Sequence, residues 1–411
     1  MGSVGQRQTS LARRIRVRIG RVAGAVVLGG AALSSSAALA PAASAAAPAS
    51  TAAAISAGFD HTCALTSGSP SKRGAVRCWG DNAYGQLGNG TTNASFTPVG
   101  VSGLSSKVAA IAAGTHFSCA LTTSGGVKCW GDNAQGQLGN GTTIASSVPV
   151  SVSGLSSGVV AITTGAYQAC ALTNGGGVKC WGDNNYGKLG SGTLADSSTP
   201  VDVVGLTSGV AAVSTQVWDT CALTTSGAVK CWGWNFYGQL GNGTLIDSST
   251  PVDVSGLSSG VTSIAVGGYH ACAILSGSGS VTCWGQGRYG QLGDGTATDS
   301  STPLIVSGLS GATAVTGGTY HACAVTSSGS ASCWGANNVG ALGNGTATNS
   351  SVPVSVSGLY GAVGISGGRF HSCAVTGTGR ALCWGGNIRG QLGNGSTTNS
   401  YTPVSVSGFV K

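Results

Sequence analysis

The tripeptide Cys-Trp-Gly occurs seven times in this chain, and its regular spacing limits the folds that the chain can adopt. The seven copies begin at Cys78, Cys129, Cys180, Cys231, Cys283, Cys333 and Cys383. The steps between them are 51, 51, 51, 52, 50 and 50 residues. A period of this size is typical of a propeller or a solenoid built from one repeated supersecondary unit.

Each repeat contains four short segments that are rich in Val, Ile, Ala or Thr and bounded by Gly, Ser or Asn. In the second repeat these segments are 108–112, 118–122, 126–130 and 149–152. The pattern predicts β-strands, and no segment after the N-terminal region shows a helical period. Four strands in each of seven units predict an all-β fold, a seven-bladed β-propeller of four-stranded antiparallel blades.

The two ends of the repeat region favour a closed ring. Residues 52–57 predict a first strand and 403–407 a last one, and a closed ring leaves no sheet edge exposed. Which of these strands closes the ring stays open at this stage. An open solenoid is the alternative, but it needs atypical capping repeats, and the outer repeats here resemble the inner ones.

Each repeat has two cysteines, one before a tight turn and one in Cys-Trp-Gly. Because the strands on either side of the turn are antiparallel neighbours, the two cysteines face each other and can form a disulfide. We therefore predict seven bridges within the blades: Cys63–Cys78, Cys119–Cys129, Cys170–Cys180, Cys221–Cys231, Cys272–Cys283, Cys323–Cys333 and Cys373–Cys383.

A zinc site at His61, Cys63 and Cys78 is the rival interpretation of these cysteines. It is disfavoured because all seven repeats keep both cysteines and only four have His at this position. We therefore expect no metal and no other cofactor.

Residues 1–45 have the layout of a secretory signal peptide. Five arginines between Arg13 and Arg21 precede an apolar run from about Val22 to Leu33, and a small-residue stretch at 43–45 follows. This arrangement is typical of export signals, and the apolar run is too short to span a bilayer. We expect cleavage near Ala45 in a bacterial-type secreted protein, an Ala/Pro-rich linker at 46–54 and the propeller at 55–411. The export route, general or twin-arginine, stays open.

The positive charge of the chain is concentrated in this predicted signal. Six of the 19 Lys and Arg lie at or before Arg21 and none of the 11 acidic residues does, which leaves 13 basic and 11 acidic groups. Such a balance does not support nucleic-acid binding. We expect no nucleic-acid partner, no membrane span and a monomer.

The repeats also share a longer motif, G-x-x-H-[ST/A]-C-A-[LIV] followed by C-W-G-x-N-x-x-G-Q-L-G-x-G. Residues 58–65 and 85–88 carry it in the first repeat. The motif resembles the repeat of the regulator of chromosome condensation (RCC1-type) family over about residues 55–411. This resemblance implies the seven-bladed propeller that the period and the strand count also predict.

The resemblance says less about function. The eponymous family members are nuclear exchange factors for a small GTPase, an activity that we do not expect in an exported chain whose repeats carry no large insertion. The chain is also similar in plan to secreted propellers that inhibit β-lactamases, which bind through aromatic residues just before the strand that opens each hairpin. It departs from them in its hairpin cysteines and its longer repeats.

Connectivity predicts one face of the ring as the binding surface. The G-x-x-H turn and the turn after Cys-Trp-Gly lie at the same end of every blade, which gathers all five histidines there. Variable residues, mostly aromatic, occupy this end on a constant frame, as a recognition surface requires. The candidates are Tyr167, Trp218, Tyr269, Tyr320, Phe370, His116, Tyr84, Tyr186, Tyr237, Tyr289 and Trp234, with Phe236 beside them.

Packing between blades is the structural alternative for these rings. We expect the four histidines at the motif position, His61, His270, His321 and His371, to hydrogen-bond neighbouring backbone. The seven tryptophans of Cys-Trp-Gly are expected in the core.

These observations predict a secreted, non-catalytic module that binds a secreted or wall-associated protein through the candidate face, with enzyme inhibition as one form of this activity. A carbohydrate-binding propeller at the cell wall is the first alternative, and a secreted hydrolase or lyase using Asp and His is the second. Because the chain has no Glu and only sparse Asp, a pair of catalytic carboxylates is not expected. We predict no catalytic residues.

Overall fold

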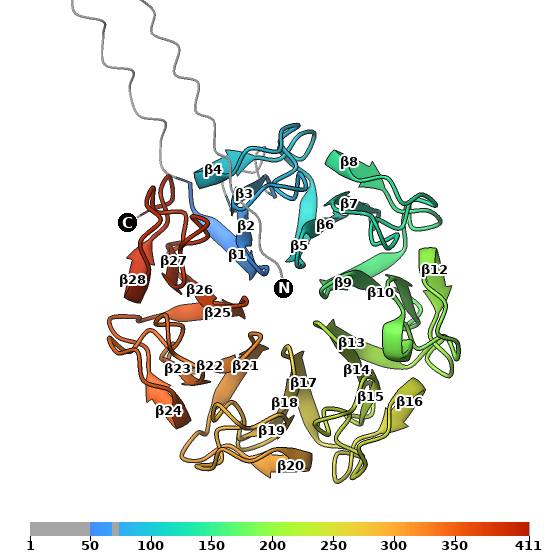
Figure 1. Ribbon diagram of the computed structural model, residues 1–411, viewed down its shortest axis with the longest axis vertical. Helices are drawn as coiled ribbons and strands as arrows, with labels where there is room; N and C mark the ends of the chain where they lie inside the picture. Colours follow the sequence, from blue (N-terminus) through green and yellow to red (C-terminus); the bar gives the residue numbers. More distant parts are fainter. Residues whose placement is uncertain (1–49, 68–73, 411) are drawn as a thin grey trace, which may run out of the picture. The chain divides into compact units, whose positions relative to one another are not determined.

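The computed structural model describes residues 50–67 and 74–410, and the predicted signal peptide, most of the linker and part of the first hairpin loop lie outside these ranges. Within the compact unit Ala47–Lys411, seven four-stranded antiparallel sheets form a ring (Figure 1). The predicted seven-bladed β-propeller is therefore confirmed. The described residues contain one helical element, the 3-10 turn η1 (Asn185–Gly187). In the same ranges, no helix has the length and apolar character needed to cross a membrane.

The strands have these bounds. Blade 1 is β1 (Ala52–Ala57), β2 (His61–Thr66), β3 (Val76–Gly80) and β4 (Ser95–Gly100). Blade 2 is β5 (Val108–Ala113), β6 (Phe117–Thr122), β7 (Val127–Gly131) and β8 (Ser146–Ser151). Blade 3 is β9 (Val159–Thr164), β10 (Gln168–Thr173), β11 (Val178–Gly182) and β12 (Ser197–Asp202). Blade 4 is β13 (Val210–Thr215), β14 (Asp219–Thr224), β15 (Val229–Gly233) and β16 (Ser248–Asp253). Blade 5 is β17 (Val261–Val266), β18 (His270–Leu275), β19 (Val281–Gly285) and β20 (Ser300–Ile305). Blade 6 is β21 (Ala312–Gly317), β22 (His321–Thr326), β23 (Ala331–Gly335) and β24 (Ser350–Ser355). Blade 7 is β25 (Ala362–Gly367), β26 (His371–Thr376), β27 (Ala381–Gly385) and β28 (Ser400–Ser405).

In the second blade, three of the four predicted strands agree with β5, β6 and β7 to within one residue. The fourth, β8, begins at Ser146, three residues before the predicted start at Pro149. Because β8 is the outer edge strand of its sheet, the missing N–H of Pro149 is tolerated inside it.

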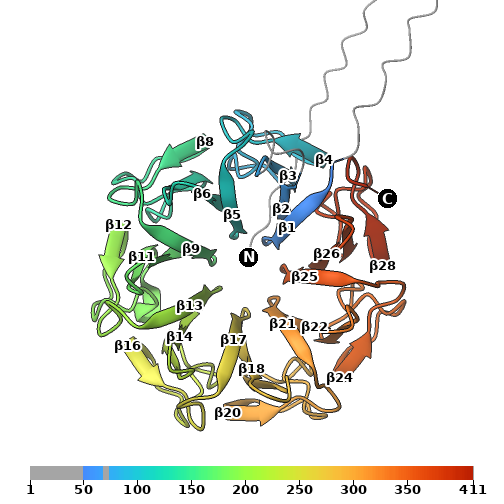
Figure 2. The ribbon, with the colours of Figure 1, turned by 180° about the vertical axis from the view of Figure 1, so that it is seen from behind.

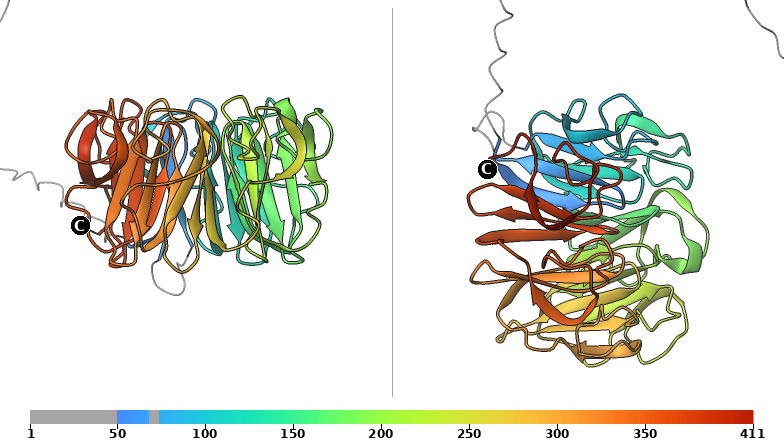
Figure 3. Two further views of the ribbon diagram at one scale, coloured as in Figure 1. Left: turned by 90° about the horizontal axis from the view of Figure 1, so that it is seen from below. Right: turned by 60° about the vertical axis from the view of Figure 1, so that its left-hand side comes forward.

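The first strand of each blade faces the central axis and the fourth lies at the outside (Figures 1 and 2). The strands run between two ends that carry the connecting loops (Figure 3). A cavity of about 240 Å³ lies at the ends of the first strands of the blades, and the side chains that line it are small, aliphatic, hydroxylic or amide.

Each blade consists of one continuous segment, so β1 belongs to blade 1 and β28 to blade 7. The ring is closed by the residues that flank these strands. The Ser50 N–H donates to the Gly408 carbonyl at 2.9 Å, and the Val410 N–H donates to the Ser50 carbonyl at 2.9 Å. Phe409, 2% exposed, packs against Trp79 with the ring centroids 6.2 Å apart. The segment predicted as a linker, 46–54, thus contains closing contacts and the start of β1 at Ala52.

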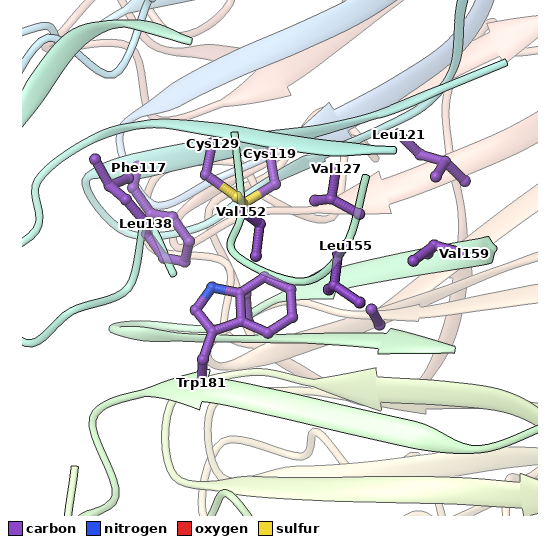
Figure 4. Packing of buried hydrophobic residues seen from close by; sticks show 12 residues of the cluster. Phe117, Cys119, Leu121, Val127, Cys129, Leu138, Val152, Leu155, Val159 and Trp181 are labelled. Carbon is purple, nitrogen blue, oxygen red and sulfur yellow. A yellow bond between two sulfur atoms is a disulfide. The ribbon is translucent and has the colours of Figure 1, made fainter. Parts of the chain in front are cut away.

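The seven tryptophans of Cys-Trp-Gly lie in the core, as predicted, and all are 0% exposed; they fill the junctions between blades. Trp181 of blade 3 packs against Leu138 and Leu155, close to the Cys119–Cys129 bridge of blade 2 (Figure 4). Its Nε1 donates to the Gln137 carbonyl at 3.0 Å. The same bond crosses every junction, including the last, where Trp79 Nε1 donates to the Gln391 carbonyl at 2.9 Å.

All fourteen cysteines are paired within their own blades. The bridges are the seven that the sequence predicts: Cys63–Cys78, Cys119–Cys129, Cys170–Cys180, Cys221–Cys231, Cys272–Cys283, Cys323–Cys333 and Cys373–Cys383. Each joins directly opposed residues of the second and third strands, with Cα atoms 4.0–4.1 Å apart. The sulfur atoms of the first repeat are bonded to each other, so they are not free to bind zinc.

The glycine of Cys-Trp-Gly has a geometric reason to recur. Its φ lies between 102° and 110° in all seven copies, a region that favours glycine. A Cβ at Gly80 would lie 2.6 Å from the Asp60 carbonyl oxygen and 2.7 Å from the His61 Cα. Glycine is therefore required where the third strand ends against the turn that precedes the second.

Candidate functional site

Two turns of every blade meet at one end of the ring, as the connectivity predicts. The Asp81 N–H donates to the Asp60 carbonyl at 2.9 Å, and the Asp132 N–H donates to the His116 carbonyl at 2.9 Å. These bonds join the turn before the second strand to the turn after the third. Side chains from both turns therefore share one surface, which we call the aromatic rim. Its rings belong to Phe59, Tyr84, His116, Tyr167, Tyr186, Trp218, Trp234, Phe236, Tyr237, Tyr269, Tyr289, Tyr320 and Phe370.

Blade 4 carries the densest part of the rim. The rings of Trp218 and Trp234 have centroids 5.6 Å apart, and Tyr186 of blade 3 lies 5.9 Å from Trp218. Phe236 stacks on Trp234 at 5.8 Å and is 62% exposed. Tyr237 contacts Trp234 edge-on at 5.5 Å. This cluster places several large rings in mutual contact at the surface.

The contacts continue from blade 4 around the ring to blade 1. Tyr269 stacks on Tyr320 at 5.4 Å, and Tyr320 lies 6.0 Å from Phe370. The Arg369 guanidinium lies 4.7 Å from the centroid of Phe370 and 4.5 Å from that of Phe59. Since Trp234 also contacts Tyr269 at 6.1 Å, one arc of touching rings extends from blade 3 through blade 7.

A shorter arc occupies blades 1 to 3. Tyr84 stacks on His116 with centroids 4.6 Å apart, and His116 lies 6.4 Å from Tyr167. All eleven candidate residues predicted from the sequence thus lie on the rim. Phe59 and Arg369 were missed because they lie two residues before the motif histidine, at a position where the other repeats have small or aliphatic residues.

The prediction that all five histidines belong to the face is wrong for four of them. His61, His270, His321 and His371 are at most 1% exposed, and only His116 reaches the surface. The four lie beneath the rim because the motif position begins the second strand, in the interior of its sheet.

The expectation that these histidines bond to backbone is also wrong. His61 Nε2 lies 2.8 Å from the Ser118 hydroxyl of the next blade. The same contact, also 2.8 Å, joins His321 to Ser372 and His371 to the Thr62 hydroxyl. The partner is the residue one place further along the motif in the next blade. Each such histidine therefore links two blades.

His270 is the exception, because the corresponding residue of the next blade is Ala322. Neither ring nitrogen of His270 has a hydrogen-bond partner. Burial lowers the pKa of His61, His270 and His371 to about 3 and that of His321 to about 4. All four imidazoles are neutral at pH 7, and their burial keeps them from exchanging protons with a ligand on the rim.

The junction of blades 3 and 4 contains buried charges. Lys188 replaces the motif Gln, is 0% exposed and forms an ion pair with Asp183. Asp219 replaces the motif His, and neither of its buried carboxylate oxygens has a partner. Burial raises the pKa of Asp219 well above its usual range, although Lys188 acts against this shift. The Lys188 ammonium lies 5.5 Å from the Trp218 ring, so these groups lie beneath the rim.

Charge is unevenly distributed around the rim. The residue after Cys-Trp-Gly is Asp81, Asp132 and Asp183 in blades 1 to 3, whereas blades 4 to 7 have no acid at this position. The cations Arg288, Arg369 and Arg389 come from the turns of blades 5 and 7. The position directly after Cys-Trp-Gly is therefore acidic in three consecutive blades, and the arginines of the rim come from two others.

A pocket of about 370 Å³ opens between blades 6 and 7, and Tyr320, Phe370 and Arg369 are among its lining residues. In residues 50–67 and 74–410, no group of three or more His, Cys, Asp or Glu lies together as a metal site would need.

Family models match most of the chain. The model of the RCC1-like domain matches residues 18–274. The model of the regulator of chromosome condensation (RCC1) repeat matches residues 278–325, 328–375 and 378–411.

Curated relatives are identical to this chain at about a third of the aligned positions. The ultraviolet-B receptor UVR8 of Arabidopsis thaliana is 32% identical over 256 residues, which are 62% of this chain and 57% of the relative. The E3 ubiquitin-protein ligase HERC2 of Homo sapiens is 34% identical over 264 residues, which are 63% of this chain and 5% of the ligase. The chain thus spans little more than half of the first relative and a small part of the second.

Solved structures share the fold. Human WBSCR16 superposes with a TM-score of 0.73 at 26% identity, over 81% of this chain and 94% of that one. Yeast RCC1 (Prp20), solved with Kap60, has a TM-score of 0.72 at 20% identity, over 87% of this chain and 85% of that one. At that identity the second likeness indicates the fold alone.

Proposed function

The chain belongs to the regulator of chromosome condensation (RCC1) repeat family, and from this premise we propose that it is a non-catalytic protein-binding module whose contact surface is the aromatic rim. The observation that carries the proposal is the long arc of touching rings from blade 3 through blade 7. Tyr and Trp side chains provide large contact areas at a small loss of conformational entropy, which makes them frequent anchors of protein interfaces.

The centre of the proposed interface is the blade 4 cluster. Trp218 and Trp234 are half-buried, whereas Phe236 is 62% exposed. A partner that covers Phe236 removes apolar area from water without rearranging the rings around it. Because the arc is continuous rather than divided into one-ring sites, it favours a protein over a sugar as the ligand.

The titratable groups buried beneath the rim support a binding role rather than catalysis. The four motif histidines are buried and neutral, and Lys188 is paired with Asp183 in the interior. The cavity at the ends of the first strands is lined by uncharged side chains. None of these groups meets the requirement that a general acid or base reach its substrate. We therefore assign no catalytic residue.

We further propose that the protein acts outside the cell as a monomer, with a secreted or wall-associated protein as its partner and enzyme inhibition as one form of this activity. The support is the basic, apolar and small-residue layout of 1–45 together with seven disulfides, which are typical of oxidising compartments. Nucleotide exchange on a GTPase is not part of the proposal.

A capture experiment tests the rim. Immobilised protein is incubated with culture supernatant and cell-wall extract of the source organism, and bound proteins are identified by mass spectrometry. The double variant Trp218→Ala/Tyr269→Ala should lose the specific partner. The matched control is Tyr360→Ala, since Tyr360 is 81% exposed but lies in the turn between blades 6 and 7 at the opposite end.

All three proteins should have the same melting temperature within a few degrees. If the double variant keeps every partner, the contact surface lies elsewhere. Retention on insoluble cell-wall polysaccharide, lost in the double variant, would instead support the carbohydrate alternative.

A further inference from the structure

We propose that the pocket between blades 6 and 7 binds the C-terminal residue of a partner protein, with an apolar side chain in the pocket and the terminal carboxylate on Arg369. This proposal rests on the proposed function, because it assigns the chemistry of one part of the protein-binding rim.

The pocket arises where blade 6 departs from the repeat. In blades 5 and 7 the motif Gln folds back over its own turn: Gln291 Oε1 accepts from the Tyr289 N–H at 2.8 Å, and Gln391 Oε1 accepts from the Arg389 N–H at 2.9 Å. Blade 6 has Ala341 at this position. The space that a Gln side chain would occupy is left open.

A second difference between blades 5 and 6 enlarges this space. Gln291 also donates from Nε2 to the Gln286 Oε1 at 3.0 Å, and the residue equivalent to Gln286 in blade 6 is Ala336. Ala336, Val339 and Ala341 form one wall of the pocket, with Tyr289, Tyr320 and Phe370 around them. The result is a largely apolar cavity of about 370 Å³.

Arg369 lines the pocket and supplies an ordered, unpaired cation. Its guanidinium lies between the rings of Phe59 and Phe370, and its buried Nε has no hydrogen-bond partner. The ion pairs of the described residues are Lys179–Asp202, Lys188–Asp183 and Lys230–Asp253, so Arg369 belongs to none of them. A planar guanidinium held in this way presents its remaining N–H donors in the geometry that a carboxylate accepts.

The charges around the pocket favour an anionic ligand. His321 also lines it but is neutral, since burial lowers its pKa to about 4. Asp60 is close enough for Arg369 to lower its pKa, although burial raises that pKa overall, and it is not in the ion pairs of the described residues. Arg369 is the one cation among the residues that line the pocket, and none of these residues is acidic.

A large apolar cavity beside one cation determines which carboxylate ligands fit the site. An Asp or Glu side chain carries only one or two methylene groups and would leave most of the cavity unfilled. The last residue of a protein that ends in Phe, Leu or Met carries an apolar side chain and a carboxylate on the same carbon. A chain end therefore satisfies both parts of the site at once.

Peptide binding to the full-length protein tests the proposal by isothermal titration calorimetry. The probe is N-acetyl-Gly-Gly-Phe with a free carboxyl end, compared with the same peptide as its C-terminal amide. We expect the acid to bind at least about tenfold more tightly, because only the acid forms the charged pair with Arg369. Equal affinity of acid and amide, or no binding of either, would overturn the proposal.

Two variants locate the site. Ala341→Gln restores the side chain that the repeat carries elsewhere, so it should fold normally while filling the pocket and abolishing binding of the acid. Arg369→Gln should remove the preference for acid over amide. Unchanged binding by Ala341→Gln, in a protein with a wild-type melting temperature, would place the peptide elsewhere and contradict the proposal.

Two further arms separate this inference from the proposed function. Trp218→Ala/Phe236→Ala should bind the peptide as the wild type does, since neither residue lines the pocket or contacts a ring that lines it. If partner capture depends on the rim but the peptide does not bind, the inference fails and the proposed function stands. 3-Phenylpropanoate that binds as tightly as the peptide would assign the pocket to a free small acid and overturn the chain-end assignment.

Discussion

Two sets of aromatic residues, separated by a few positions in the sequence, differ in how far they are exposed to solvent. Trp232 lies in β15 and Phe236 in the turn that follows it, yet Trp232 is 0% exposed and Phe236 is 62% exposed. The tryptophan recurs in all seven blades and makes the same bond to the preceding blade each time. The ring at the position of Phe236 does not recur, since the other repeats have Ala, Asn, Arg or Ile there.

The difference follows from the geometry of a closed ring. Every blade packs against two neighbours, so a side chain in the junction must fit the same surface seven times. A side chain on the rim contacts solvent and is released from that constraint. In this chain, therefore, recurrence of an aromatic residue indicates packing, and variation among aromatic residues at one end of the blades indicates a surface available for recognition.

The largest expected effect is a loss of stability that distinguishes the buried tryptophans from the exposed rings. Trp232→Ala should lower the free energy of unfolding by about 3–5 kcal/mol, because it leaves a cavity in a blade junction and removes the Nε1 bond to the Lys188 carbonyl at 2.9 Å. Phe236→Ala should change it by no more than about 0.5 kcal/mol. Urea unfolding followed by near-ultraviolet circular dichroism measures both. Losses of similar size would mean that Phe236 is also part of the packing.

A smaller loss is expected from the disulfides beside the tryptophans. Replacing Cys119 and Cys129 together by Ser should destabilise the protein by about 2–3 kcal/mol, because the bridge closes a loop with a separation of 10 residues. Partner capture should be unaffected, since both residues are buried in the frame. Thiol titration of the unfolded, unreduced wild type should find no free thiol, and a measurable thiol content would contradict the complete pairing.

At pH 7 the smallest expected effect concerns the histidines between the two aromatic layers. The pKa of His270 is about 3 in the folded protein and about 6.5 when unfolded, so folding favours the neutral form. The contribution of His270 to stability is complete above about pH 6.5 and is lost as the pH falls toward 3. The slope is at most about 1.4 kcal/mol per pH unit.

The variant His270→Gln tests this dependence. Gln168 already occupies the equivalent position of blade 3, and His270 has no hydrogen bond to lose. The variant should be close to the wild type in stability at pH 7 and should lose less of it between pH 6.5 and 4. Parallel stability curves for the two proteins, from urea unfolding at each pH, would show that His270 does not titrate on unfolding.

Features that depend on the repeat could be predicted without coordinates. The period, the alternation of short strands and turns, and the two cysteines on either side of a hairpin specify local geometry that is the same in every copy. The strand bounds of blade 2, the seven disulfides and the buried tryptophans follow from it. The candidate residues of the rim were also predicted, because connectivity alone places the two turns at one end.

Features that depend on two different repeats could not be predicted in this way. The bond of His371 to Thr62 joins residues 309 positions apart, and the stacking of Arg369 on Phe59 needs the same closure of blade 7 onto blade 1. The pocket at Ala341 is visible in the sequence only as a missing Gln. Its depth depends on Tyr320 and Phe370 from two adjacent blades.

The sequence by itself determined the blade and the number of blades, because hydrogen bonds between neighbouring strands and short turns are local interactions that seven copies repeat. The tertiary structure decided what the seven copies form together: which histidines find a hydroxyl, which rings touch, and where a cavity opens beside a cation. These contacts join residues from different blades, and only the closed ring brings those residues together.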